Sequence, residues 1–164
     1  MKFTDKFLIG IVIGVSVIVI AAFALALAQP QPVYRADDAP ENIAHNYLFA
    51  LQQKEYARAY GYLSPTLKGY PRSLDEFENR VRQNLWNFRA DENVTLQVEP
   101  ARINGDRADV VVKETRFTSS GWLGANTRPT TFEMRLTRDA ETGAWKLVDG
   151  NRYWASCWDE GGCR

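Results

Sequence analysis

The pattern of hydrophobic and polar residues divides the chain into an uncharged N-terminal run and a longer, mixed remainder. Residues 7–28 contain no charged side chain, and as an α-helix they would span roughly 33 Å, about the hydrocarbon thickness of a bilayer. The run therefore predicts a transmembrane helix. A signal peptide cleaved after Ala26-Leu27-Ala28 is the alternative, although the run is longer than a typical signal core. The predicted organisation is an anchor over 1–28, a linker over 29–37 and a domain over 38–164.

Basic residues at the two ends of this run predict its orientation. Lys2 and Lys6 precede it, whereas only Arg35 follows it closely, so the positive-inside rule places the N-terminus in the cytoplasm. We therefore expect a single-pass protein of the cell membrane with an extracytoplasmic C-terminal domain. Gly10 and Gly14 form a G-x-x-x-G motif, which can pair membrane helices into a homodimer, but glycine is also simply common in such helices.

Three segments after the Pro-rich linker show helical periodicity. Their apolar positions are Ile43, Tyr47 and Leu51 in the first, Tyr56, Tyr60 and Leu63 in the second, and Leu74, Phe77, Val81, Leu85 and Phe88 in the third. Asp38 and Pro40 are typical of a helix start, and Pro65 ends or bends the second helix. Ser73 and Glu76 have the spacing of a capping box, which predicts the start of the third helix.

From residue 92 the hydrophobic period changes from helical to two. The alternating positions are Val94, Leu96 and Val98, then Ala108, Val110 and Val112, then Phe132, Met134 and Leu136, and finally Trp145 and Leu147. Pro100 interrupts the pattern, and Asn104-Gly105-Asp106 predicts a hairpin turn. Helices followed by consecutive antiparallel strands indicate an α+β domain.

The charge balance limits the classes of partner. Without Lys2, Lys6 and Asp5, the chain after residue 28 has 20 − 2 = 18 basic and 20 − 1 = 19 acidic residues, so its net charge is −1. This near-neutrality argues against a nucleic-acid partner. The two cysteines, Cys157 and Cys163, enclose a glycine pair, and outside the cytoplasm they predict a small disulfide loop rather than two free thiols.

Two stretches resemble the nuclear transport factor two-like superfamily, which has a cystatin-like α+β cone fold. The segment PENIAHNYLFALQQKEYARAYGYLSP, starting at Pro40, resembles the family's first helix pair, and GAWKLVDG, residues 143–150, resembles its last strand. The resemblance covers roughly residues 38–154 and implies three helices packed on a curved four-stranded antiparallel sheet. The superfamily includes isomerases, dehydratases, transport adaptors, secretion-machine subunits and membrane-anchored proteins of unknown function, and an anchor with this fold most resembles the last two groups. The resemblance therefore implies a fold more than a function.

Ionisable residues give little support for an enzyme. His45 is the only histidine and lies off the apolar stripe of its helix, while Glu133 and Asp149 occupy a polar strand face and a turn. The sequence shows no catalytic triad order, metal-ligand cluster or phosphate-binding glycine loop. We therefore assign no catalytic residue, cofactor or metal, and favour a non-enzymatic role, leaving the enzyme question open.

Aromatic residues are the stronger candidates for a site. Tyr47, Tyr56 and Tyr60, with His45, are candidate residues of a ligand pocket, although core packing is the favoured explanation for the three tyrosines. The pair Trp122 and Leu123, in a predicted hairpin loop, suggests a contact with a partner or with the mouth of the cone.

The favoured function is a membrane-anchored, extracytoplasmic domain that binds a partner protein or a small apolar ligand. One alternative is a subunit of an envelope or secretion assembly. Another is an isomerase, dehydratase or hydrolase that uses the cone cavity. A buried pair of ionisable groups favours the enzyme, and an open aromatic cavity favours a ligand carrier.

Overall fold

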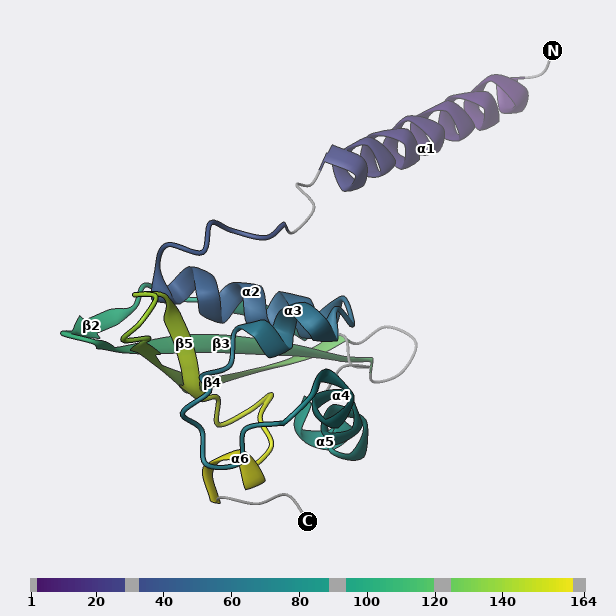
Figure 1. Ribbon diagram of the computed structural model, residues 1–164. Helices are drawn as coiled ribbons and strands as arrows, with labels where there is room; N and C mark the ends of the chain where they lie inside the picture. The colour runs from purple at the N-terminus through teal and green to yellow at the C-terminus, as the bar shows by residue number, and fades with distance from the viewer. Residues whose placement is uncertain (1–2, 29–32, 89–93, 120–124, 161–164) are drawn as a thin grey trace. The chain divides into compact units, whose positions relative to one another are not determined.

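The computed structural model describes residues 3–28, 33–88, 94–119 and 125–160 (Figure 1). The chain forms two units, Met1–Val33 and Tyr34–Arg164. The first consists of helix α1 (Phe3–Ala28), and the second contains all the other described helices and strands. Each unit is described by itself below.

The predicted transmembrane helix is wrong. Within the part of the chain that the structure describes, no helix is both long enough and apolar enough to cross a membrane. The expected single-pass localisation in the cell membrane, which depended on that helix, is corrected with it.

The second unit begins with helices whose ends follow from local chemistry. They are α2 (Pro40–Gln52), α3 (Tyr56–Gly61), α4 (Leu74–Gln83) and α5 (Leu85–Phe88). Pro40 stands in the first turn of α2, where its missing N–H costs no hydrogen bond. The Ser73 side chain accepts a hydrogen bond from the Glu76 backbone N–H at 3.2 Å, which confirms the predicted helix start. The Glu76 carboxylate accepts from Arg72 N at 2.6 Å, and this bond is the main cause of its lowered pKa.

The predicted third helix is interrupted at Asn84. Its side-chain amide donates to the Arg80 backbone carbonyl at 2.9 Å, and the backbone there leaves the helical conformation. Asn competes for backbone hydrogen bonds in this way, so the apolar stripe continues into α5 as a separate helix.

The strands that the structure describes form one five-stranded antiparallel sheet rather than the expected four-stranded one. They are β1 (Val94–Val98), β2 (Arg102–Asn104), β3 (Arg107–Ser119), β4 (Ala125–Arg138) and β5 (Trp145–Asp149). The order is β1-β3-β4-β5, and β2 pairs with β3 beyond the end of β1. Pro100, which cannot donate to a strand ladder, lies where β1 and β2 separate. Gly105 turns β2 into β3 with a φ of +61°, as the predicted hairpin requires.

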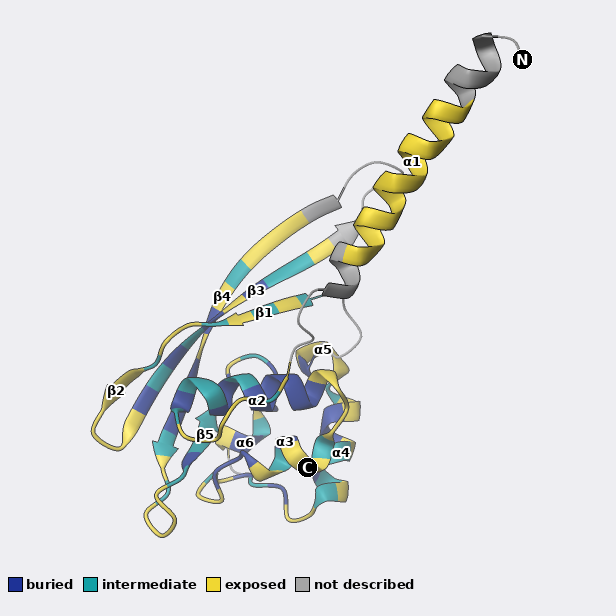
Figure 2. Ribbon diagram, turned by 90° about the horizontal axis from the view of Figure 1, so that it is seen from above, coloured by how far each residue is buried: buried dark blue, intermediate teal, exposed yellow. Residues whose placement is uncertain are grey.

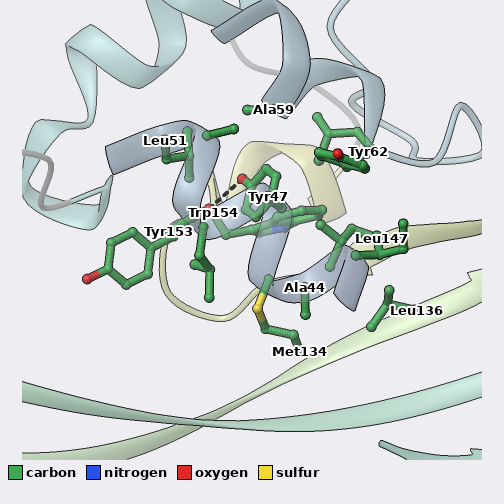
Figure 3. Packing of buried hydrophobic residues seen from close by; sticks show 14 of the residues in the cluster. Ala44, Tyr47, Leu51, Ala59, Tyr62, Met134, Leu136, Leu147, Tyr153 and Trp154 are labelled. Atoms are coloured by element: carbon green, nitrogen blue, oxygen red, sulfur yellow. Dashed lines mark hydrogen bonds between the residues drawn. The ribbon is translucent and has the colours of Figure 1, made fainter. Parts of the chain in front are cut away.

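The core lies on one face of this sheet, here called the inner face. It carries Val110, Val112, Met134, Leu136 and Leu147, all buried, and α2 packs across it (Figure 2). Figure 3 shows Met134 and Leu136 beneath Ala44 and Tyr47 of α2. The α+β class expected from the sequence is therefore confirmed, without the transmembrane helix.

The C-terminal tail completes this core. After β5 the chain places Tyr153, Trp154, Ala155 and Trp158 in the interior, the last within helix α6 (Cys157–Glu160). Trp158 stacks on Phe77 at 5.6 Å between ring centroids. Gly69 allows this close approach, because a Cβ at that position would lie 2.2 Å from the Cys157 carbonyl oxygen.

Candidate functional site on the inner face of the sheet

Three successive rungs of the inner face change from apolar to cationic. The first rung pairs Val98, Val112 and Phe132 across β1, β3 and β4, the second pairs Leu96, Glu114 and Thr130, and the third pairs Val94, Arg116 and Arg128. Cross-strand partners in register share one face of a sheet. The inner face therefore begins in the hydrophobic core and ends, three rungs later, with two guanidinium groups.

Glu114 is a buried carboxylate in the middle of this gradient. Only 1% of its surface is exposed. Its Oε1 accepts hydrogen bonds from Arg116 Nη2 and from Arg152 Nη1, each at 3.1 Å, and Arg152 Nη1 also donates to Thr130 Oγ1 at 3.1 Å. A carboxylate at this depth requires such charged partners, because desolvation would otherwise make it very costly.

The arginine side chains of this site are partly exposed to solvent, unlike the buried Glu114. The Arg116 and Arg152 side chains are 23% and 31% exposed, and Arg128 is more exposed still. The Arg128 side chain makes no hydrogen bond or ion pair with the residues that the structure describes. Among the described residues, Arg116 and Arg152 contact the carboxylate and Arg128 lies beside Arg116 in register, so these three arginines and Glu114 together have a net charge of 3 − 1 = +2. We call Glu114, Arg116, Arg128 and Arg152 the inner-face cluster.

Arg152 comes from a loop whose backbone is held in an unusual conformation. Its neighbours Asn151 and Tyr153 have φ values of +49° and +58°, a region that side chains other than glycine rarely adopt. Tyr153 N donates to Asn87 O at 3.1 Å, and the Tyr47 hydroxyl donates to Tyr153 O at 2.7 Å (Figure 3). Strained backbone persists where surrounding contacts determine it, so these contacts fix the position of Arg152 over the sheet.

The predicted pocket residues are distributed over the helical half and do not converge with the inner-face cluster. Tyr47 is fully buried, and burial raises the pKa of its hydroxyl well above the ordinary value. The Tyr60 hydroxyl donates to Pro71 O at 2.7 Å, and the Tyr56 ring meets Phe77 edge to face. His45 is half-buried and stacks on Phe49. Their contacts are those of core residues, and their role in ligand binding stays a prediction.

The remaining predicted contact residues are not tested. Trp122 and Leu123 lie outside the described residues. Gly10 and Gly14 lie on the exposed surface of α1. Cys163 also lies outside the described residues, so the disulfide to Cys157 stays a prediction that comparison of non-reduced and reduced masses would check.

Sequence reasoning missed Glu114 although a signal was present. The alternation of Ala108, Val110 and Val112 places residue 114 next on the buried face, where a carboxylate is rare. The carboxylates considered instead face away from the core, and Asp149 pairs with Arg135. Among the described residues, no group of three or more His, Cys, Asp or Glu side chains could hold a metal ion.

Comparisons with known proteins give fold likenesses only. The sequence matches no protein-family model and no curated protein. Similar solved structures include a SEC-C motif containing protein from Rhodopseudomonas palustris, with 14% identity over 71% of this chain and 80% of that one, at a TM-score of 0.48. A candidate ketosteroid isomerase from Shewanella frigidimarina has 20% identity over 69% and 94% of the two chains, with a TM-score of 0.48.

A cystatin-fold protein from Novosphingobium aromaticivorans has 7% identity over 67% of this chain and 97% of that one, at a TM-score of 0.36. Because all these TM-scores lie below 0.5, they support no argument about function. The α+β class stands on the described sheet and helices themselves.

Proposed function

We propose that the domain is a non-enzymatic binding module for a small amphipathic ligand, with an apolar body and an acidic group. The observation behind it is the gradient along the inner face, from Phe132 through Glu114 to Arg128. Guanidinium groups recognise carboxylates with two parallel hydrogen bonds, so the acidic group would bind at Arg116, Arg128 and Arg152. The apolar body would lie along Val94 and Leu96, which are only half-buried.

The excess of cations supports anion binding over catalysis at this cluster. Glu114 Oε1 already accepts from two guanidinium groups, so its hydrogen-bonding capacity is partly used within the protein. The exposed Arg128, in contrast, has its donors available to a ligand. An isomerase or dehydratase would use the carboxylate as its reacting group, whereas a binding module uses it to hold the arginines in place.

Octanoate and its neutral match octanamide test this proposal by isothermal titration calorimetry. We expect saturable binding of octanoate and weaker binding of octanamide, since only the former can form charge-assisted hydrogen bonds. Arg128→Gln should weaken octanoate binding roughly three- to tenfold, and Arg152→Gln by about tenfold or more. Arg128→Gln is the cleaner variant, because its side chain stabilises no described contact.

Lys113→Gln is the matched control. Lys113 lies on β3 between Val112 and Glu114 but on the opposite, outer face, so its loss should leave octanoate binding unchanged. Equal binding of octanoate and octanamide would contradict the proposal. Equal loss in Arg128→Gln and Lys113→Gln would also contradict it, since the effect would then reflect overall charge.

A further inference from the structure

The outer face of the same sheet contains a second polar concavity, separate from the inner-face cluster. It is a groove of about 630 Å³, and its polar lining residues are Thr66, Asn104, Arg107, Asp109, Arg135 and Thr137. These side chains come from the loop after α3 and from β2, β3 and β4. Nothing in the proposed function uses them.

Two oppositely charged side chains in this groove make no hydrogen bond or ion pair in the described part of the chain. The Arg107 side chain makes no hydrogen bond or ion pair there, and the Asp109 carboxylate accepts no hydrogen bond. Asp109 pairs in register with Arg102 on one side and Arg135 on the other. Arg135 itself is engaged, because its Nε donates to Asp149 Oδ2 at 3.0 Å.

The groove also provides neutral donors and acceptors beside these charges. Asn104 pairs with Arg107 across β2 and β3, and Arg107 pairs with Thr137 across β3 and β4. The Thr137 hydroxyl donates to Asp106 O at 3.1 Å. The pKa of Arg135 is raised chiefly by Asp149 and further by Asp109, so Arg135 and Asp109 lie within electrostatic reach of each other.

We infer that this groove binds a small zwitterion, a molecule with one carboxylate and one ammonium group. The carboxylate would bind the Arg107 guanidinium in bidentate geometry, and the ammonium would bind the Asp109 carboxylate. Arg107 and Asp109 are two residues apart on β3, roughly 6.6 Å along the strand, so the ligand's two charged groups are separated by several bonds. A single-charge ligand would leave one of these two groups unpaired.

Calorimetry with γ-aminobutyrate and its two half-ligands, butyrate and butylamine, tests this inference. We expect γ-aminobutyrate to bind saturably and each half-ligand to bind roughly tenfold or more weakly, because each loses one charged hydrogen-bond pair. Arg107→Gln and Asp109→Asn should each weaken γ-aminobutyrate binding to a similar extent. Both side chains face solvent within the groove, so their replacement should leave the fold intact.

Two controls separate this site from the rest of the surface. Lys113→Gln removes a cation from the same strand and the same face but outside the groove lining, and should leave binding unchanged. Arg128→Gln, on the inner face, should also leave it unchanged. The inference is overturned if γ-aminobutyrate gives no saturable heat, if butyrate binds as tightly, or if Arg128→Gln weakens binding as much as Arg107→Gln does.

Discussion

The two faces of the sheet each contain a carboxylate held by arginine, and the two groups differ in burial. On the inner face, Glu114 is 1% exposed and meets Arg116 and Arg152. On the outer face, Asp149 is 21% exposed and its partner Arg135 is 62% exposed. Water screens the outer pair, whereas the inner carboxylate depends on its protein partners. The same chemistry should therefore stabilise the fold strongly on one face and weakly on the other.

Removing an arginine from the inner-face cluster should have the largest effect. Arg152→Ala leaves the buried Glu114 with fewer cationic partners and removes the hydrogen bond to Thr130. We expect the free energy of unfolding to fall by about 3 kcal/mol. Urea denaturation of Arg152→Ala and of the wild type measures this difference.

A double variant shows whether charge burial is the cause. Adding Glu114→Gln to Arg152→Ala removes the uncompensated charge and should recover a large part of the lost stability. If the double variant is as unstable as Arg152→Ala, the loss comes from other contacts of the Arg152 side chain, such as that with Thr130, and the contrast between the two faces is not electrostatic. Lys113→Ala, on the exposed face of β3, should change stability by less than about 0.5 kcal/mol.

Removing the outer ion pair of Asp149 and Arg135 should lower the free energy of unfolding less than removing Arg152 does. Asp149→Asn removes the exposed ion pair with Arg135 and should lower the free energy of unfolding by about 1 kcal/mol or less. The Asp149 carboxylate also accepts from Asn151 N at 2.9 Å, a bond that the Asn side-chain oxygen can retain. Urea denaturation at low and high salt checks the prediction, since only an exposed pair weakens clearly with salt. A loss as large as that of Arg152→Ala would remove the distinction between the faces.

Much of the fold could be predicted from local pattern, because the information lies within one element. The alternation of Val94, Leu96 and Val98 gave β1, and the spacing of Ser73 and Glu76 gave the start of α4. The number of strands was predicted wrongly, because Pro100 interrupts the alternation and β2 follows it as a separate short strand. The predicted transmembrane helix was wrong, since no helix in the described part of the chain is both long enough and apolar enough to cross a membrane.

The site was harder to predict because its parts come together only in the folded chain. Arg152 is 38 residues from Glu114, and the Tyr47 hydroxyl meets the carbonyl of Tyr153, 106 residues away. No short motif encodes such pairs. Strand alternation alone could have placed Glu114 on the inner face, but not its partners. The tail residues Trp154 and Trp158 were likewise outside any predicted element, although they complete the core.

The smallest expected effect is a pH-dependent change in stability at Asp159, whose pKa responds to the outer pair of Asp149 and Arg135. Asp159 accepts from Trp154 Nε1 at 3.1 Å, and its pKa is raised above 3.8, first by burial and then by the nearby charge of Asp149, while Arg135 lowers it. A raised pKa means that the folded state prefers the protonated form. Asp159 therefore contributes stability below about pH 4, and this contribution is lost as the pH rises through the raised value.

Asp159→Asn should remove this pH dependence while retaining an acceptor for Trp154. Because Asp159 is largely exposed, the gain in stability over the wild type at pH 7 should be well under about 1 kcal/mol. Urea midpoints of both proteins between pH 3 and pH 7 measure it. Asp149→Asn should lower the pKa of Asp159 and shrink the effect, whereas Arg135→Gln should raise the pKa and enlarge it. If neither variant changes the pH dependence, Asp159 does not interact with the outer pair, and the outer charges do not act as one group.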